Sequence, residues 1–299
     1  MRNWRLAAVS AGAAVLIAGC TSAGTTQSTV PAPSTLSSSL PASTPSAGIR
    51  WLIAASAISK LDDIADPAVV ARYLDGAQTT IVTSRTIPDF LAGWHVHFAL
   101  DTRSLQEIRL AIAGTLSPRI TLILYDPEHW SFTPIAQQSA VGTATRTAAS
   151  IAHGAGRELI VAPATNLAQK MAPGESTADA FMQTNDLGKV AVSADWVEIQ
   201  AQGLERNPER YAAYINDALR QIRLANPNAV VYAGLSTNPS GPPVDAAELV
   251  EDVRLTSSTV SGYWLNIPSP GTACPRCGQP QPQIALGLLE SLDRGSGSS

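Results

Sequence analysis

The sequence is poor in charge, in aromatic residues and in cysteine. Of its 299 residues, 15% are charged and 5% are aromatic, and there are three cysteines. No cluster of Lys or Arg occurs in a chain whose formal net charge is −4. Binding to nucleic acid or to an anionic surface depends on such a cluster, so the sequence argues against a nucleic-acid partner.

Several motifs that carry familiar chemistry are also missing. The chain has no G-x-S-x-G nucleophile elbow, no Walker phosphate loop and no G-x-G-x-x-G dinucleotide motif, so no cofactor is expected. His95 and His97 have the spacing of metal ligands, but they stand at the start of a predicted strand. Only His129 and His153 remain as further histidines, and no metal site is expected.

The N-terminus has the features of a bacterial export signal. In residues 1–19, two arginines precede an apolar run that contains no acidic residue, and the run is too short for a persuasive transmembrane helix. It ends in L-I-A-G-C, which resembles the lipobox of bacterial lipoproteins. The resemblance implies cleavage before Cys20 and a lipid on this cysteine. The alternative is an ordinary signal with an incidental cysteine.

The next segment predicts a tether. Residues 20–47 are almost entirely Ser, Thr, Pro, Ala and Gly, a composition that cannot bury enough apolar surface to fold. The tail 295–299 is expected to be unstructured for the same reason. We therefore expect an extracytoplasmic protein, attached to the membrane by its N-terminal lipid, whose folded part spans residues 48–294. Its oligomeric state is left open.

The folded part reads as eight short β-rich runs with helical stretches between most of them. This alternation predicts a single (β/α)₈ barrel. The clearest helix begins at Asn207-Pro208-Glu209, with a capping residue, a proline in the first turn and an acidic residue after it. Further helices are predicted at 105–113, 144–153, 245–255 and 282–292. The predicted strands are 51–56, 80–85, 96–101, 120–126, 158–165, 196–202, 229–237 and 263–268.

Alternation within the strands predicts which side chains enter the barrel. In residues 197–202, Val, Ile and Ala alternate with Glu198, Gln200 and Gln202, and the outer face of a barrel strand must be apolar to pack under helices. The three polar side chains should therefore point inward. The same rule places further residues inside the barrel: His97, Asp101, Tyr232, Ser236, Asn238, Trp264 and Asn266.

The fourth predicted strand ends in a concentration of acidic side chains. Its parity places Leu122, Leu124, Asp126 and Glu128 on one face, with the two carboxylates at the C-terminal end. Active sites of such barrels lie at that end, so we expect a functional mouth there. The alternative is that Asp126 caps the following helix and that Glu128 is a solvated loop residue.

Two resemblances support this interpretation. The segments Y-D-P-E-H-W (125–130), E-I-Q-A-Q (198–202), S-T-N-P-S-G (236–241), Y-W-L-N-I-P (263–268) and C-P-R-C (274–277) resemble a group of secreted actinobacterial barrel proteins. A second resemblance is to chitinase-type glycoside hydrolases, whose fourth strand ends in D-x-D-x-E and whose eighth strand supplies a Trp. Asp126 and Glu128 match the last D-x-E, and Trp264 matches the Trp. Leu124 replaces the first Asp, and Gln200 and Gln202 stand where that family has Tyr-Asp.

The residues and the second resemblance together suggest roles. Glycoside cleavage needs an acid for the leaving oxygen and a second carboxylate across the anomeric carbon. Glu128 is the candidate acid, and Asp126 is expected to raise its pKa by repulsion. Glu198, Asp101 and Asp126 itself are candidates for the second carboxylate. Sugar rings and hydroxyl groups are expected to contact a further set of side chains: Tyr125, Trp130, Asn166, Gln200, Gln202, Asn238, Trp264 and Asn266.

Two functions therefore stay open. The first is a surface-anchored glycoside hydrolase, and the second is a lipoprotein that binds a glycan or a small ligand at the same mouth without cleaving it. The missing carboxylate at the seventh strand favours the second. In an exported protein, Cys274 and Cys277 are expected to form a short disulfide, with a redox pair or half a zinc site as the alternatives.

Overall fold

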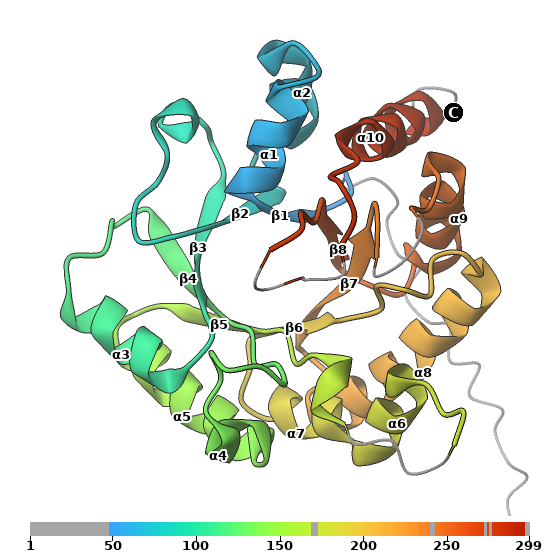
Figure 1. Ribbon diagram of the computed structural model, residues 1–299. Coiled ribbons are helices and arrows are strands. Elements are labelled where there is room, and N and C mark those ends of the chain that lie inside the picture. The colour runs from blue at the N-terminus through green and yellow to red at the C-terminus, as the bar shows by residue number, and fades with distance from the viewer. Residues whose placement is uncertain (1–47, 169–172, 240–242, 272–273, 275–276, 297–299) are drawn as a thin grey trace, which may run out of the picture. The chain divides into compact units, whose positions relative to one another are not determined.

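The protein folds into a closed barrel of eight parallel strands. The computed structural model describes residues 48–168, 173–239, 243–271, 274 and 277–296. Each strand pairs with the next in chain order, and β8 pairs with β1 (Figure 1). The predicted (β/α)₈ barrel is confirmed. The strands are β1 (Trp51–Ala54), β2 (Thr79–Thr83), β3 (His97–Thr102), β4 (Ile120–Tyr125), β5 (Glu158–Val161), β6 (Trp196–Ile199), β7 (Val230–Ser236) and β8 (Gly262–Asn266).

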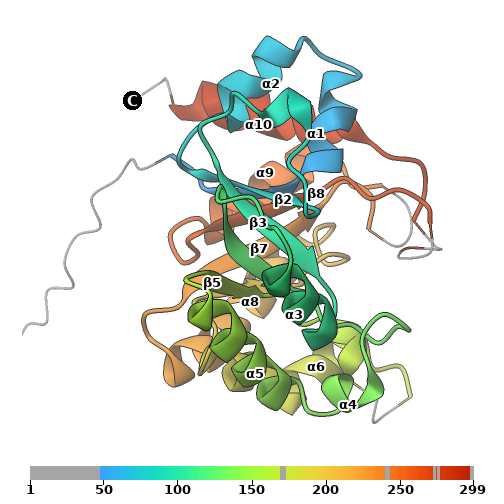
Figure 2. The same ribbon diagram turned by 90° about the vertical axis from the view of Figure 1, so that its left-hand side faces the viewer.

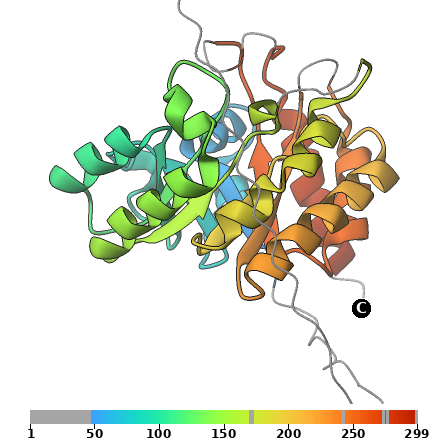
Figure 3. The same cartoon turned by 90° about the horizontal axis from the view of Figure 1, so that it is seen from below.

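The helices form a layer outside the strands. In the view of Figure 3, the green helices of the first half and the yellow to red helices of the second half lie on opposite sides of the strands. Figures 1 and 2 both place the last helix beside the first, which closes the ring of helices. The helices are α1 (Ala55–Asp62), α2 (Pro67–Leu74), α3 (Leu105–Ala113), α4 (Ile135–Gln138), α5 (Val141–Gly154), α6 (Thr177–Thr184), α7 (Asp186–Ala191), α8 (Pro208–Ala225), α9 (Ala246–Thr256) and α10 (Pro282–Ser296).

Local sequence explains where the helices begin. The Asn207 side chain accepts a hydrogen bond from the backbone N–H of Arg210, and Pro208 occupies the first turn of α8, as its sequence predicts. Asp245 and Glu248 form a reciprocal capping box at the start of α9. These caps satisfy backbone donors that the helix itself leaves free, so both helices begin at fixed residues.

The described connection from β2 to β3 has no α-helix to cover the barrel. Between β2 and β3 the chain forms only the 3₁₀ turn η1 (Asp89–Leu91), whose Leu91 side chain is fully buried. Arg119 fixes this loop by donating to the carbonyls of Ala92 at 2.8 Å and Trp94 at 2.6 Å. A loop anchored by an arginine thus replaces a helix on this side of the barrel.

Two apolar clusters hold the barrel together. The larger one fills the layer between the strands and the helices. The smaller one lies inside the barrel, where side chains of six strands meet, and it consists of Leu52, Val82, Ala99, Leu122, Leu124, Ile160, Ala162 and Tyr232. This inner apolar cluster separates the two open ends of the barrel.

The ends of the chain differ in part from expectation. Residues 1–19, Cys20 and the rest of 20–47 lie outside the described residues. Helix α10 continues to Ser296 and so includes the first two residues of the predicted tail. Within the described ranges, no helix has the length and hydropathy needed to cross a membrane.

Candidate active site

Three carboxylate side chains meet at the carboxyl ends of β3 and β4. Asp101 lies near the end of β3, and Asp126 and Glu128 follow β4 directly. The Arg103 guanidinium lies 3.3 Å from the Asp101 carboxylate. From β6, the Gln200 amide nitrogen donates to Asp126 at 3.1 Å and to the carbonyl of Ala162 at 3.1 Å. Residues that are far apart in sequence therefore meet at the mouth, as the strand parity predicts.

Glu128 is held in place by its neighbours. Its side chain is half-buried and accepts a hydrogen bond from the Asn166 amide nitrogen at 3.2 Å. The amide oxygen of the same Asn166 accepts from the backbone N–H of His129 at 2.8 Å. Helix α4 begins after Pro134 without a side-chain cap, so Asp126 does not cap it. The solvated-loop alternative therefore does not describe Glu128.

Burial is the largest cause of the raised pKa values of the carboxyl groups at the mouth. Burial raises the pKa of Asp126 well above its usual range, and the charges of Glu128, Asp101 and Glu198 raise it further, whereas Arg103 lowers it.

Burial also raises the pKa of Glu128, while the Asn166 hydrogen bond and Arg103 lower it and Asp101 raises it. Within this coupled pair, the charge of Glu128 is one cause of the raised pKa of Asp126.

Aromatic rings and Arg103 form one wall of the mouth. The Trp130 and Phe132 rings meet edge to face with centroids 5.3 Å apart. The Arg103 guanidinium carbon lies 5.4 Å from the Trp130 ring and 5.1 Å from the Phe132 ring, within the range of cation–π contacts. The Trp130 indole N–H donates to the Thr133 hydroxyl at 2.8 Å, which fixes the ring orientation.

A cavity opens beside these groups. It has a volume of about 590 Å³, lies at the carboxyl ends of β1 to β3, and is lined in part by Asp101 and Arg103. This volume falls in the range of small-ligand sites. Sequence reasoning missed Arg103 and Phe132. Arg103 has the same parity as Asp101, so the alternation that identified Asp101 also contained the signal for Arg103.

Glu198 lies deeper than the mouth. Its side chain is 0% exposed, and among the described residues neither carboxyl oxygen has a partner with full hydrogen-bond geometry. Burial raises its pKa well above the usual range, the neighbouring Gln202 amide lowers it, and Glu128 raises it. Glu198 is therefore a fully buried carboxyl one layer below Asp126, without the open access of Glu128.

Gly234 on β7 makes room for this arrangement. A Cβ atom at Gly234 would lie 2.4 Å from the Gln202 amide nitrogen and 2.5 Å from a Glu198 carboxyl oxygen. The Trp264 side chain stands at the paired position on β8, packs against the inner apolar cluster and has no hydrogen-bond partner for its indole N–H among the described residues. Asn266 is half-buried at the end of β8.

Two expected contact residues are engaged in the protein itself. The Asn238 side chain is 1% exposed and donates to the carbonyls of Gly278 at 3.3 Å and Gln279 at 3.1 Å. It holds the loop between β8 and α10 and is not free for a ligand. Tyr125 points outward from β4, is 0% exposed and donates to Gln137, so it is a core residue.

The Asn238-bound loop also carries the disulfide. Cys274 and Cys277 are bonded, with Cα atoms 5.4 Å apart, and this prediction is confirmed. No group of three or more His, Cys, Asp or Glu side chains in the described part of the chain is arranged to hold a metal ion. His97 lies at the opposite end of the barrel from the mouth, where it lines a second cavity.

A second pair of buried carboxyls lies behind β7. Glu205 is 0% exposed and accepts hydrogen bonds from the backbone N–H groups of Gly203 at 2.5 Å and Ser236 at 2.9 Å. Burial raises the pKa of Glu205 to about 7 against the opposing effect of these bonds. Asp252 on α9 is also 0% exposed, and burial raises its pKa to about 8, with Glu205 as the next cause. Sequence periodicity gave no signal for this pair.

Similar folds occur among barrels with different activities. No protein-family model matches the chain, and no curated protein matches its sequence. A chitinase from Chromobacterium violaceum is 11% identical over 84% of this chain and 100% of its own, with a TM-score of 0.46. A triosephosphate isomerase from Bartonella henselae is 12% identical over 82% and 99%, with a TM-score of 0.44.

A further similar structure is a GH128 endo-β-1,3-glucanase from Amycolatopsis mediterranei in complex with laminaritriose. It is 14% identical over 81% of this chain and 99% of its own, with a TM-score of 0.39. Hydrolase and isomerase barrels thus resemble this chain about equally, and the likeness concerns the fold alone.

Proposed function

We propose that the mouth of the barrel cleaves a glycosidic bond in a polysaccharide or glycoconjugate, with Glu128 as the general acid. The observation that carries this proposal is the setting of Glu128. It is half-buried at the end of β4, its pKa is raised by burial, and Asn166 fixes its orientation. A carboxyl that keeps its proton near neutral pH and remains accessible is what protonation of a leaving oxygen requires.

The other groups of the mouth fit complementary roles. Glu128 donates its proton to the glycosidic oxygen as the bond to the anomeric carbon breaks, and water then adds to that carbon and gives up one proton to a carboxylate. Asp101 is the best candidate for the second carboxylate: burial raises its pKa, but the Arg103 guanidinium 3.3 Å away opposes this shift and favours the ionised form. Asp126, whose pKa is raised by burial and by the neighbouring carboxyls, serves as a hydrogen-bonding neighbour of the reacting groups. Trp130 and Phe132 offer rings against which a sugar can pack.

The attachment to the membrane is part of the same proposal. The L-I-A-G-C segment supports lipidation of Cys20 and an extracytoplasmic location. The described chain enters the barrel at the amino end of β1, which is the end opposite the mouth.

The test is a substitution that removes only the proton. Glu128→Gln preserves size and hydrogen bonding to Asn166, and it should lower turnover about 10²- to 10⁴-fold on any polysaccharide that the wild type cleaves. Ligand affinity should change by no more than a few-fold. The measurement is release of reducing ends across a panel of cell-envelope and environmental polysaccharides. Glu209→Gln, on the first turn of α8, is the matched control and should behave as wild type.

A binding lipoprotein without catalysis is the second candidate. The end of β7 favours this function, because Ser236 and Asn238 are buried there and supply no second carboxylate to the mouth. Binding of a glycan without cleavage over days would select this function. Normal turnover by Glu128→Gln would instead show that another group is the acid.

A further inference from the structure

The end of the barrel opposite the mouth contains a second cavity. It has a volume of about 640 Å³ and lies at the amino ends of the strands. Most of its polar lining stands at inward-facing positions of separate strands or just before them. These residues include Arg50, Gln78, His97, Glu158, Trp196 and Tyr232. The floor of such a barrel is usually closed by apolar residues that serve stability. This floor cavity is polar and aromatic, and it has the volume of a small-ligand site.

A stacked pair of rings forms one wall of the floor cavity. The Trp196 and Tyr232 rings are nearly parallel, at 5° and with centroids 5.3 Å apart. Tyr232 is 1% exposed, and a Cβ atom on the neighbouring Gly262 would lie 2.7 Å from its ring, so the tyrosine ring cannot move toward β8. Trp196 is only half-buried. Its indole therefore rests on a fixed support and presents its remaining surface to the cavity.

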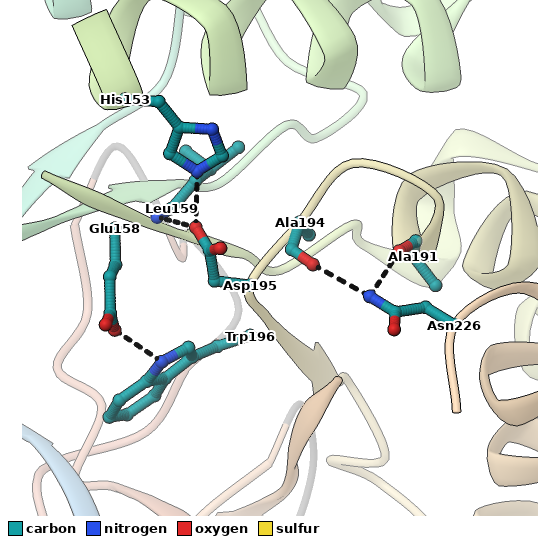
Figure 4. Close-up of polar contacts among 8 residues, drawn as sticks. All are labelled: His153, Glu158, Leu159, Ala191, Ala194, Asp195, Trp196 and Asn226. Carbon is teal, nitrogen blue, oxygen red and sulfur yellow. Dashed lines mark hydrogen bonds and ion pairs between the residues drawn. The ribbon is translucent and has the colours of Figure 1, made fainter. Parts of the chain in front are cut away.

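Hydrogen bonds fix the position of Trp196. Figure 4 shows the Glu158 side chain beside the indole, whose Nε1–H donates to Glu158 at 2.9 Å. The preceding residue, Asp195, accepts from the backbone N–H of Leu159 at 2.8 Å and from His153 Nε2 at 2.7 Å. These bonds join the start of β6 to β5 and α5, so the indole is oriented before any ligand binds.

The cavity also contains positive charge that the protein does not neutralise. Arg50 donates to the neutral Gln78 side chain at 3.0 Å, and Arg157 donates to the carbonyl of Pro118 at 3.5 Å. Across the described ranges, neither guanidinium has a carboxylate within ion-pairing distance. In a chain of net charge −4, two such arginines in one cavity are suited to an external anion.

We propose that the floor cavity binds an acidic saccharide, that is, a sugar ring that carries a carboxylate. The ring packs on the exposed surface of Trp196, and the carboxylate pairs with Arg157 or Arg50. The ring hydroxyls donate to Glu158 and Gln78. The Glu158 carboxylate favours an acidic sugar over a simple anion. It repels both, but it can accept hydrogen bonds from the hydroxyl groups of the sugar. This site is separate from the mouth, and the proposal does not depend on the function of the mouth.

Binding of α-1,4-linked trigalacturonate to the full protein, measured by isothermal titration calorimetry, tests the proposal. We expect saturable binding that weakens as salt is added, and at least tenfold weaker binding of the neutral analogue galactotriose. Trp196→Ala and Arg157→Gln should each weaken trigalacturonate binding about tenfold or more. Arg220→Gln, an exposed arginine on α8 that is absent from the cavity lining, is the matched control and should bind as wild type.

Three outcomes would overturn the proposal. The first is no binding of trigalacturonate to the wild type, and the second is equal binding of the neutral analogue. The third is binding that falls with Arg103→Gln but persists in Trp196→Ala, because such binding lies in the mouth. Thermal denaturation of each variant separates lost binding from lost folding. Arg157→Gln keeps the test valid if Trp196→Ala is unstable, since Arg157 is half-buried and its one hydrogen bond to the described residues goes to a backbone carbonyl.

Discussion

Asp252 allows a quantitative test of the buried charge behind β7. Its side chain is 0% exposed, and among the described residues neither carboxyl oxygen has a hydrogen-bond partner. Burial, together with the charges of Glu205, Glu248 and Glu251, raises its pKa from 3.8 to about 8. The folded protein therefore holds a proton on Asp252 at pH values where the unfolded chain has released it.

The sign and the size of the effect follow from this difference. Because the folded pKa is the higher one, the stabilisation is fully present below about pH 4 and is lost as the pH rises toward 8. One group that differs by one bound proton changes the free energy of unfolding by at most about 1.4 kcal/mol per pH unit. Between pH 5 and pH 7, Asp252 should therefore lower the stability by up to about 3 kcal/mol.

Asp252→Asn removes the titration and nearly preserves the shape. Urea denaturation at pH 5, 6, 7 and 8 should show the wild type losing stability with rising pH, and the variant losing clearly less. Above pH 7 the variant should be the more stable protein. Some slope should remain in the variant, because the pKa of Glu205 is also raised, to about 7. Asp217→Asn, an exposed carboxylate on α8, should keep the wild-type slope. Equal slopes in the wild type and Asp252→Asn would refute the reasoning.

Three further predictions concern anchoring, redox state and packing. Cys20→Ser should move the protein from membranes to the soluble fraction, and unchanged retention in membrane fractions would contradict lipidation. Thiol labelling of the exported protein should find Cys274 and Cys277 blocked until a reductant is added, whereas free thiols without reductant would contradict the bonded pair. Gly234→Ala should cost about 1–3 kcal/mol of stability in chemical denaturation, because its methyl group would displace Glu198 and Gln202; an unchanged midpoint would show that both side chains move freely.

The sequence predicts the barrel well because two periodic signals agree there. Eight apolar runs alternate with helical ones, and the parity of residues 196–202 correctly places Glu198 inside the barrel. Seven of the eight strands are shorter than predicted, and β3 has the predicted length but begins one residue later. The ladder of β6 ends at Ile199, and the Gln200 side chain bonds to Asp126 and Ala162 beyond it. Apolar periodicity continues past the last ladder bond, so it overestimates strand length.

The parts of the site that the sequence did not predict depend on contacts between distant segments. The strand alternation predicts that Asn238 lines the barrel, but its hydrogen-bond acceptors are backbone carbonyls about 40 residues later in the chain. No local sequence pattern predicts these contacts. Glu205 and Asp252 lie in a loop and on a helix far apart in sequence, and only the folded chain buries both and lets the charge of Glu205 act on Asp252. Phe132 belongs to the mouth because Arg103, from the preceding strand, lies over its ring.

The two ends of the barrel are chemically separate. Inward side chains form three layers along the axis, with carboxylates and Gln200 at the mouth, the inner apolar cluster in the middle, and the arginines, Glu158 and Trp196 at the floor. Leu122 belongs to the inner apolar cluster and also lines the floor cavity, so the cluster begins directly above that cavity. A channel between the mouth and the floor cavity would have to displace several aliphatic side chains of the inner apolar cluster.

This separation has a consequence for how the protein can act. A ligand at the floor is separated from Glu128 by the inner apolar cluster, so any effect of one site on the other must pass through the strands that reach both ends. One of them is β6, which begins at Trp196 in the floor cavity and is followed by Gln200 at the mouth. Glu198 lies between them on the same strand, buried and with a raised pKa. The mouth and the floor cavity therefore cannot pass a ligand from one to the other along the barrel axis.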